Sequence, residues 1–191
     1  MNQVPVKPSA EEVVELAQAG NVVPVYAQLA ADFETPVSAF LKLRDGKNAF
    51  LFESAESTDA SGRWSIVGSQ PRWVFTSHGD EVTIERGGEV ETRNRKGDVL
   101  DEVQRLMAGY KPVTHGDAPP FFGGAVGYVG YDAAQQFEPT ISKCPEDDLR
   151  LPESIFFLAD TLVVFDHKLR RLLVVANAML DEASSPDEAY A

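Results

Sequence analysis

Three stretches of the chain carry apolar residues at helical spacing between recognisable end signals. They cover residues 9–20, 35–46 and 98–109. Ser9 and Glu12 have the spacing of a capping box. Pro36 occupies a first helical position, and Asp98 is a favourable N-cap. Each stretch finishes at a glycine, so the pattern predicts three short amphipathic helices.

Most of the remaining apolar positions alternate with polar ones, which is the period of a half-buried β-strand. The predicted strands cover residues 22–29, 48–53, 63–68, 72–77, 81–86, 89–93, 154–166 and 171–176. Pro24 interrupts the first strand, which is therefore expected at a sheet edge or a bulge. Short turns such as His78-Gly79-Asp80 join several neighbours, so these strands pair antiparallel. The predicted fold class is α+β, with a mainly antiparallel β-sheet and flanking helices.

Composition narrows the classes of partner. The 191 residues hold 17 Lys and Arg against 30 Asp and Glu, a formal net charge of −13. Negative charge of this size repels phosphate backbones and anionic lipids, so neither a nucleic acid nor a membrane is expected as a partner. The single cysteine, Cys144, excludes an intramolecular disulfide and fits a reducing compartment. No apolar run approaches the roughly 20 residues of a spanning helix, so we expect a cytoplasmic location.

Common catalytic and metal-binding motifs are not found in the sequence, whose three histidines stand far apart. The glycine-rich run at residues 123–130 lacks the spacing of a dinucleotide-binding loop, and no amphipathic helix follows it. Glycines in a strand let another backbone approach closely, which favours a structural role. The alternative is a pocket lined by Tyr128, Tyr131 and Asp132.

A second candidate lies where the strand at 48–53 ends and the strand at 63–68 begins. Glu53 and Ser54 put a carboxylate next to a hydroxyl, and Arg63 opens the following strand. Such a trio suits a zwitterion, whose ammonium group binds a carboxylate while its carboxylate binds a hydroxyl or a guanidinium. The alternative is a solvated ion pair that flanks a hairpin.

Several segments together resemble the N-terminal region of anthranilate synthase component I. They are FLFESAE at 50–56, GRWSIVG at 62–68, PFFGGAVGYVGYD at 120–132 and DDLRLP at 147–152. The similarity extends over roughly residues 8–178. The glycine-rich segment is shared with a sibling family, component I of aminodeoxychorismate synthase. The Glu-Ser-Ala-Glu sequence at 53–56 is more similar to the tryptophan branch.

The resemblance implies an activity and a form of regulation for the parent enzyme. The family converts chorismate and ammonia to anthranilate and pyruvate, uses Mg²⁺, and receives ammonia from a separate glutamine amidotransferase subunit. L-Tryptophan inhibits the family, and the Glu-Ser dipeptide belongs to that feedback site. By resemblance, Glu53 and Ser54 are L-tryptophan contacts, and Arg63 lies about where the family places a basic residue.

The resemblance also implies that this chain is part of a longer protein. The family's C-terminal half carries the chorismate pocket and the Mg²⁺ ligands, so we expect no catalytic residue, no cofactor and no activity in this fragment alone. Residues 1–180 are expected to form the N-terminal domain, as half of a β-sandwich. Residues 181–191 are expected to be a truncated linker or the start of the next helix, because Ser185-Pro186 and two acids have the pattern of a helix N-terminus. A disordered acidic tail is the alternative.

Two expectations about assembly follow from the resemblance. An isolated half of a sandwich exposes an apolar sheet face, so we expect self-association or a second polypeptide that covers it. The alternative to an enzyme fragment is a free-standing regulatory domain that binds an amino acid without a catalytic half.

Overall fold

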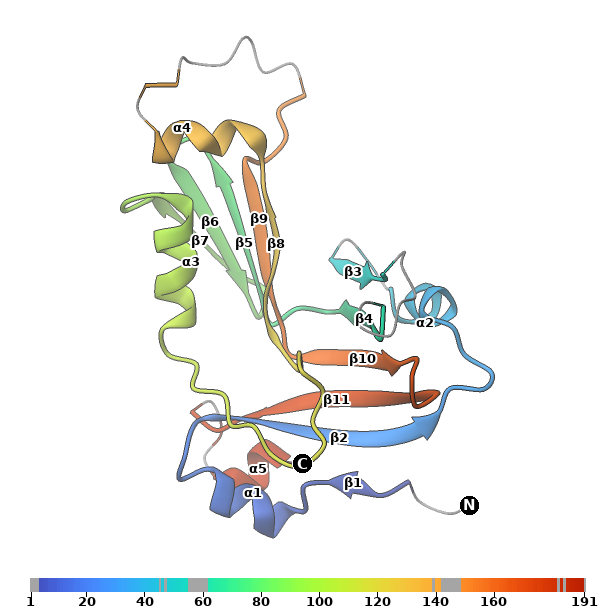
Figure 1. Ribbon diagram of the computed structural model, residues 1–191. Coiled ribbons are helices and arrows are strands. Elements are labelled where there is room, and N and C mark those ends of the chain that lie inside the picture. The colour runs from blue at the N-terminus through green and yellow to red at the C-terminus, as the bar shows by residue number, and fades with distance from the viewer. Residues whose placement is uncertain are drawn as a thin grey trace. The chain divides into compact units, whose positions relative to one another are not determined.

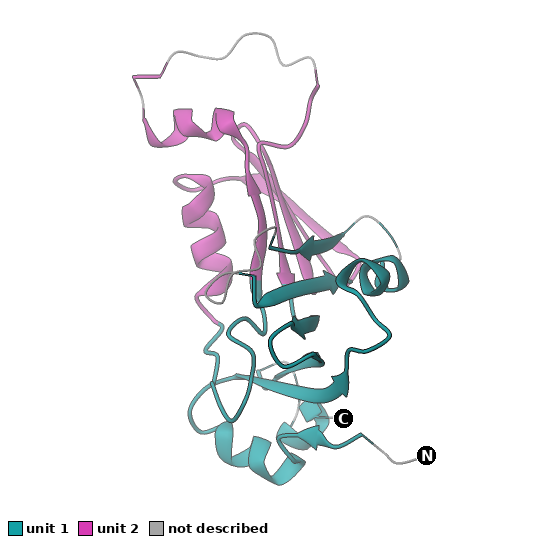
Figure 2. Cartoon of the chain, turned by 45° about the vertical axis from the view of Figure 1, so that its right-hand side comes forward, with its two compact units in different colours: residues 1–71, 110–124, 159–191 teal, residues 72–109, 125–158 magenta. Residues whose placement is uncertain are grey.

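Two antiparallel β-sheets organise the chain, and each belongs to a separate unit of the computed structural model. Unit 1 comprises residues 1–71, 110–124 and 159–191, and unit 2 comprises residues 72–109 and 125–158 (Figure 2). The structure describes residues 4–44, 46, 48–54, 62–138, 140–141, 149–181, 183 and 185–190. The predicted α+β class with mainly antiparallel sheet is confirmed.

The sheet of unit 1 has the strand order β1-β2-β11-β10-β4-β3 (Figure 1). The strands are Val6–Lys7 (β1), Val22–Ala30 (β2), Ala49–Phe52 (β3), Trp64–Ser69 (β4), Thr161–Asp166 (β10) and Arg171–Met179 (β11). Pro24 pairs with Asn177 of β11 but lies beyond the two residues of β2 that pair with β1. This part of β2 is therefore bordered by β11 and not by β1, which suits a residue without an N–H.

Helices α1 and α2 bury small apolar faces in unit 1. α1 (Ala10–Leu16) begins with the predicted capping box of Ser9 and Glu12, and its Val13 packs in a buried cluster with Val23. α2 (Pro36–Leu43) also begins with a capping box, and its Ala39 packs with Val67. The first amides of a helix lack partners inside it. The capping-box residues bind these amides and so fix where each helix starts.

The last described residues form helix α5 (Pro186–Tyr190). The Ser185 hydroxyl accepts a hydrogen bond from the Glu188 amide at 3.2 Å, so the helix start predicted at Ser185-Pro186 is confirmed. Ala189 and Tyr190 pack against the cluster that contains Val13 of α1. None of the helices in the described ranges has the length and apolar character needed to cross a lipid bilayer.

The sheet of unit 2 has the strand order β7-β6-β5-β9-β8. The strands are Trp73–His78 (β5), Glu81–Arg86 (β6), Glu89–Asn94 (β7), Gly124–Val129 (β8) and Ser154–Ala159 (β9). The helices are α3 (Val99–Met107), the 3₁₀ helix η1 (Tyr131–Ala133) and α4 (Ala134–Phe137). β5, β6 and β7 form the predicted antiparallel meander, and Trp73, Phe75 and Val82 are fully buried.

The single strand predicted over residues 154–166 is wrong. The structure divides it into β9 in the sheet of unit 2 and β10 in the sheet of unit 1, with Asp160 between them. The Asp160 carbonyl accepts from both the amide and the Nδ2 of Asn177, each at 2.9 Å. Those bonds hold the chain where it leaves one sheet for the other, which an apolar run in the sequence does not reveal.

The glycines of β8 have the predicted structural role. A Cβ atom at Gly127 would lie 1.9 Å from the carbonyl oxygen of Ile155, so only glycine lets the two backbones approach this closely. The Tyr128 hydroxyl donates to the Pro152 carbonyl at 2.8 Å, and Tyr131 is 93% exposed. With one ring this exposed, the alternative of a pocket closed around both tyrosines is not supported.

Candidate functional site

Glu53 and Ser54 directly follow β3, and both are exposed. Phe52, the last residue of β3, pairs with Ile66 of β4, and Arg63 lies immediately before β4. The antiparallel register therefore brings the end of β3 and the start of β4 to the same end of this strand pair. Ala55 and Glu56 of the predicted motif, like Cys144, lie outside the described residues.

The Arg63 guanidinium is held by Asp166, the last residue of β10. Its Nε donates to Asp166 Oδ1 at 2.9 Å and its Nη2 donates to Oδ2 at 2.8 Å, which is the bidentate geometry of a strong ion pair. The Asp166 side chain is fully covered, whereas the Arg63 side chain is 38% exposed. The guanidinium carbon also lies 4.5 Å from the centre of the Trp64 ring, a cation–π contact.

Two further donors complete the surroundings of Asp166. The Leu169 amide donates to Oδ1 at 3.3 Å, and Arg171 Nε donates to Oδ2 at 3.4 Å. Arg171 in turn donates through Nη1 to Gln28 Oε1 of β2 at 2.8 Å. The Arg63 hydrogen bonds are the main cause that lowers the pKa of Asp166, and the same bonds raise the pKa of Arg63.

The backbone next to Arg63 is fixed as well. The His167 amide donates to the Arg63 carbonyl at 2.9 Å, one residue beyond the ladder between β4 and β10. His167 Nε2 and the Ser65 hydroxyl are hydrogen-bonded at 2.7 Å, and the His167 ring stacks on Phe165. The start of β4 is therefore bound to β10 through both its main chain and its side chains.

Sequence reasoning proposed Arg63 as a ligand contact and missed its partner. The structure places Arg63 at the same end of the strand pair as Glu53 and Ser54, but it commits two donors of the guanidinium to Asp166. Asp166 lies at the end of β10, just before the turn to β11, and 103 residues separate it from Arg63. Its one signal in the sequence is that a carboxylate ends a strongly apolar strand. The roles of Glu53, Ser54 and Arg63 as L-tryptophan contacts stay predictions.

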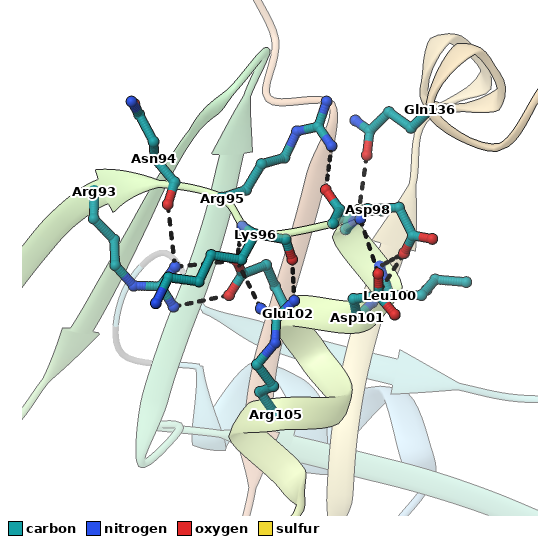
Figure 3. Close-up of polar contacts among 12 residues, drawn as sticks. Arg93, Asn94, Arg95, Lys96, Asp98, Leu100, Asp101, Glu102, Arg105 and Gln136 are labelled. Carbon is teal, nitrogen blue, oxygen red and sulfur yellow. Dashed lines mark hydrogen bonds and ion pairs between the residues drawn. The ribbon is translucent and has the colours of Figure 1, made fainter. Parts of the chain in front are cut away.

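Unit 2 contains a second covered carboxylate, Glu102 on α3 (Figure 3). Arg93 of β7 donates through Nη1 to Oε1 at 3.0 Å and through Nη2 to Oε2 at 2.8 Å. Arg105 lies 2.8 Å from Oε1, and the Lys96 amide donates to the same oxygen at 2.5 Å. The Arg93 hydrogen bonds are the largest cause that lowers the pKa of Glu102 to about 2. The network ties α3 to the edge of the sheet.

Among the described residues, no group of three or more His, Cys, Asp or Glu side chains is placed to hold a metal ion. That the Mg²⁺ ligands of the family lie in its C-terminal half stays a prediction.

Comparison with known proteins places the chain in a family. A model of the chorismate binding enzyme family matches residues 47–190, which include β3, the Glu53-Ser54 pair and both covered carboxylates. The chain belongs to the chorismate binding enzyme family. Its membership rests on most of the sequence, and the match extends over segments of both units.

Family relatives are much longer than this chain. "Anthranilate synthase component 1" of Synechocystis sp. is 37% identical over 180 residues, which are 92% of this chain and 34% of the relative. The protein of that name from Acetivibrio thermocellus is 34% identical over 171 residues, 89% of this chain and 34% of the relative. A crystal structure of anthranilate synthase component I from Streptococcus pneumoniae matches with a TM-score of 0.52 and 28% identity, over 85% of this chain and 34% of that one. The chain spans about a third of the length of these relatives.

The covered pair in unit 2 generates a testable prediction. We expect Glu102→Gln to lower the free energy of unfolding by about 2 kcal/mol, less than the roughly 3–5 kcal/mol of a fully buried pair. The smaller value follows because the Arg93 and Arg105 side chains are 31% and 44% exposed. Urea denaturation at pH 7 measures the difference. As the control, Glu91→Gln removes a 64% exposed partner of Arg93 and should cost no more than about 0.5 kcal/mol.

The same variant has an expected pH dependence. Because the pKa of Glu102 falls from 4.5 to about 2 on folding, its ionised form stabilises the folded state fully above pH 4.5. That stability is lost as the pH falls from 4.5 towards 2. The unfolding free energies of the wild type and Glu102→Gln should therefore converge over this window. A difference that stays constant from pH 6 to pH 2.5 would contradict the assignment.

Proposed function

We propose that this chain is the N-terminal, feedback-regulatory part of anthranilate synthase component I. The observation that carries the proposal is the coverage: proteins of that name match about nine tenths of this chain, which spans only about a third of each. In the parent, chorismate and ammonia give anthranilate and pyruvate with release of water, as a step of tryptophan biosynthesis. The names of the relatives favour the tryptophan branch over the aminodeoxychorismate branch.

The rest of the parent would supply the chemistry. On this proposal the chorismate pocket and the Mg²⁺ ligands belong to the part of the relatives that this chain does not match. The ammonia would come from glutamine on a separate amidotransferase subunit. Neither the metal nor the amidotransferase is assigned to a described residue of this chain.

The contribution of this chain would be to bind L-tryptophan at the end of β3. Glu53 is exposed and can receive the ammonium group, while the Ser54 hydroxyl can donate to the carboxylate of the amino acid. Arg63 at the start of β4 adds a partly exposed positive charge near the same end of the strand pair. These groups supply the opposite charges that a zwitterion requires.

Calorimetric titration of the chain with L-tryptophan tests this binding. We expect saturable binding that is weaker with L-phenylalanine and about tenfold weaker in Ser54→Ala, because a hydrogen bond to a charged group is lost. Thr161→Ala is a suitable control, since Thr161 is exposed and lies at the opposite end of β10 from Asp166. A flat titration, or equal binding by Ser54→Ala, would count against the effector role.

An activity assay tests whether the catalytic groups lie outside this chain. We expect the purified chain to form no anthranilate from chorismate, Mg²⁺ and ammonium, even at high protein concentration, because the reacting groups are proposed to lie elsewhere in the parent. Anthranilate fluorescence measures the product directly, and the full-length relative from Synechocystis sp. serves as the positive control. Turnover by the chain alone would refute the assignment of chemistry to the rest of the parent.

The chain would also self-associate, through the exposed edge of the sheet in unit 2. β8 is the last strand at one edge of the sheet of unit 2 and has no charged residue, whereas β7 at the other edge carries Glu89, Glu91 and Arg93. Tyr128 and Val129 of β8 are 44% and 39% exposed. An uncharged, apolar edge strand favours pairing with another chain.

Light scattering tests self-association. We expect the apparent mass of the chain to rise above 20.9 kDa with increasing concentration. Val129→Lys, which places a charge on the exposed edge, should reduce that rise, and Val90→Lys on the already charged β7 is the matched control. A constant monomer mass at high concentration would rule the association out.

A further inference from the structure

We propose that Asp166 is a positioning residue for the effector site, which holds Arg63 and the start of β4 in place for ligand binding. The proposal rests on the proposed function, since it assigns a role toward the same ligand. Asp166 would act on the ligand indirectly, through the position of Arg63. The basis of the proposal is the arrangement of contacts at one end of the sheet of unit 1.

The sheet order places β4 between β10 and β3. On one side, β4 pairs with β10, whose last residue is Asp166. On the other side, it pairs with β3, which ends at Phe52 just before Glu53 and Ser54. The start of β4 therefore lies between the Asp166 anchor and the strand that leads into the proposed ligand contacts.

Asp166 accepts more hydrogen bonds than a simple bidentate ion pair provides. Each of its carboxylate oxygens accepts one hydrogen bond from Arg63 and one more from Leu169 or Arg171. Its side chain is fully covered, so water does not compete for these positions. A covered carboxylate with four donors has one favourable orientation, and it imposes that orientation on the Arg63 fork.

Arg63 is fixed at three points. Asp166 binds the guanidinium, the Trp64 ring lies against the guanidinium carbon, and His167 binds the Arg63 carbonyl. An arginine side chain in solution loses considerable rotamer freedom when it binds a ligand. Because Asp166 has already ordered Arg63, the ligand meets a guanidinium whose position is set before binding.

Asp166→Asn keeps the size of the side chain but removes its charge and turns an NH₂ group toward the arginines. We expect this variant to weaken L-tryptophan binding by about threefold to tenfold, the loss that corresponds to reordering one long side chain on binding. Hydrogen exchange should become faster in residues 49–54 and 62–66. Calorimetry and exchange by mass spectrometry measure the two effects.

Glu102→Gln is the matched control, because Glu102 is also a covered carboxylate with two arginines but belongs to unit 2. It should lose stability while leaving both the binding constant and the exchange of residues 49–54 unchanged. Equal weakening by both variants, or unchanged binding in Asp166→Asn, would overturn the positioning role. If Asp166→Asn does not fold, Asp166→Glu replaces it, since glutamate keeps the charge but moves the carboxylate relative to the Arg63 fork, and unchanged binding in that variant would likewise overturn the role.

A double variant separates positioning from a direct contact. In an Arg63→Ala background, Asp166→Asn should weaken binding no further, because its effect passes through Arg63. A further loss of the same size would refute that route. If the wild type does not bind L-tryptophan, the effector proposal fails by itself. Exchange then decides the positioning role alone: unchanged exchange of residues 49–54 in Asp166→Asn would overturn it.

Discussion

A covered carboxylate between two arginines is the interaction on which the end of the sheet in unit 1 depends. Asp166 closes β10 and binds Arg63 beside β4 and Arg171 on β11, and Arg171 reaches Gln28 on β2. A single series of polar side-chain contacts thus holds four neighbouring strands together at one end. Breaking such a pair would leave a charge away from water, which costs far more than an exposed ion pair contributes. This cost disfavours any arrangement of the four strand ends in which Asp166 is not bound by its arginines.

Unit 2 also contains a covered carboxylate that is bound by arginines. Glu102 is fully covered on α3, and Arg93, Arg105 and the Lys96 amide satisfy it. The chain has only 17 cationic side chains against 30 acidic ones. Four of the arginines are committed to two covered carboxylates. In this strongly acidic chain, arginine therefore has a structural role in each unit.

Local signals predicted much of the fold. Ser9 and Glu12 are three residues apart, and the turn at Gly79 joins adjacent strands, so each pattern is complete within a few residues. The break at Asp160 was missed because its partner, Asn177, is remote in the sequence. Arg63 and Asp166 are separated by 103 residues, so their pairing could not be predicted from spacing. Glu102 was detectable in principle, since an acid on the face shared by Val99 and Leu106 interrupts the apolar stripe of a helix.

The position of the proposed effector contacts gives this architecture a functional meaning. β3 has four residues and, among the described strands, is the last one at its edge of the sheet, where it pairs with β4. The placement of Glu53 and Ser54 therefore depends on β4. β4 depends in turn on β10, through the ladder and through the Arg63–Asp166 pair. Binding and order are linked reciprocally: a ligand that favours the ordered arrangement of Arg63 must also stabilise the contacts that produce it. A ligand bound by the proposed contacts at the edge of this sheet would therefore be coupled to the strands behind it, which is the property that a regulatory site requires.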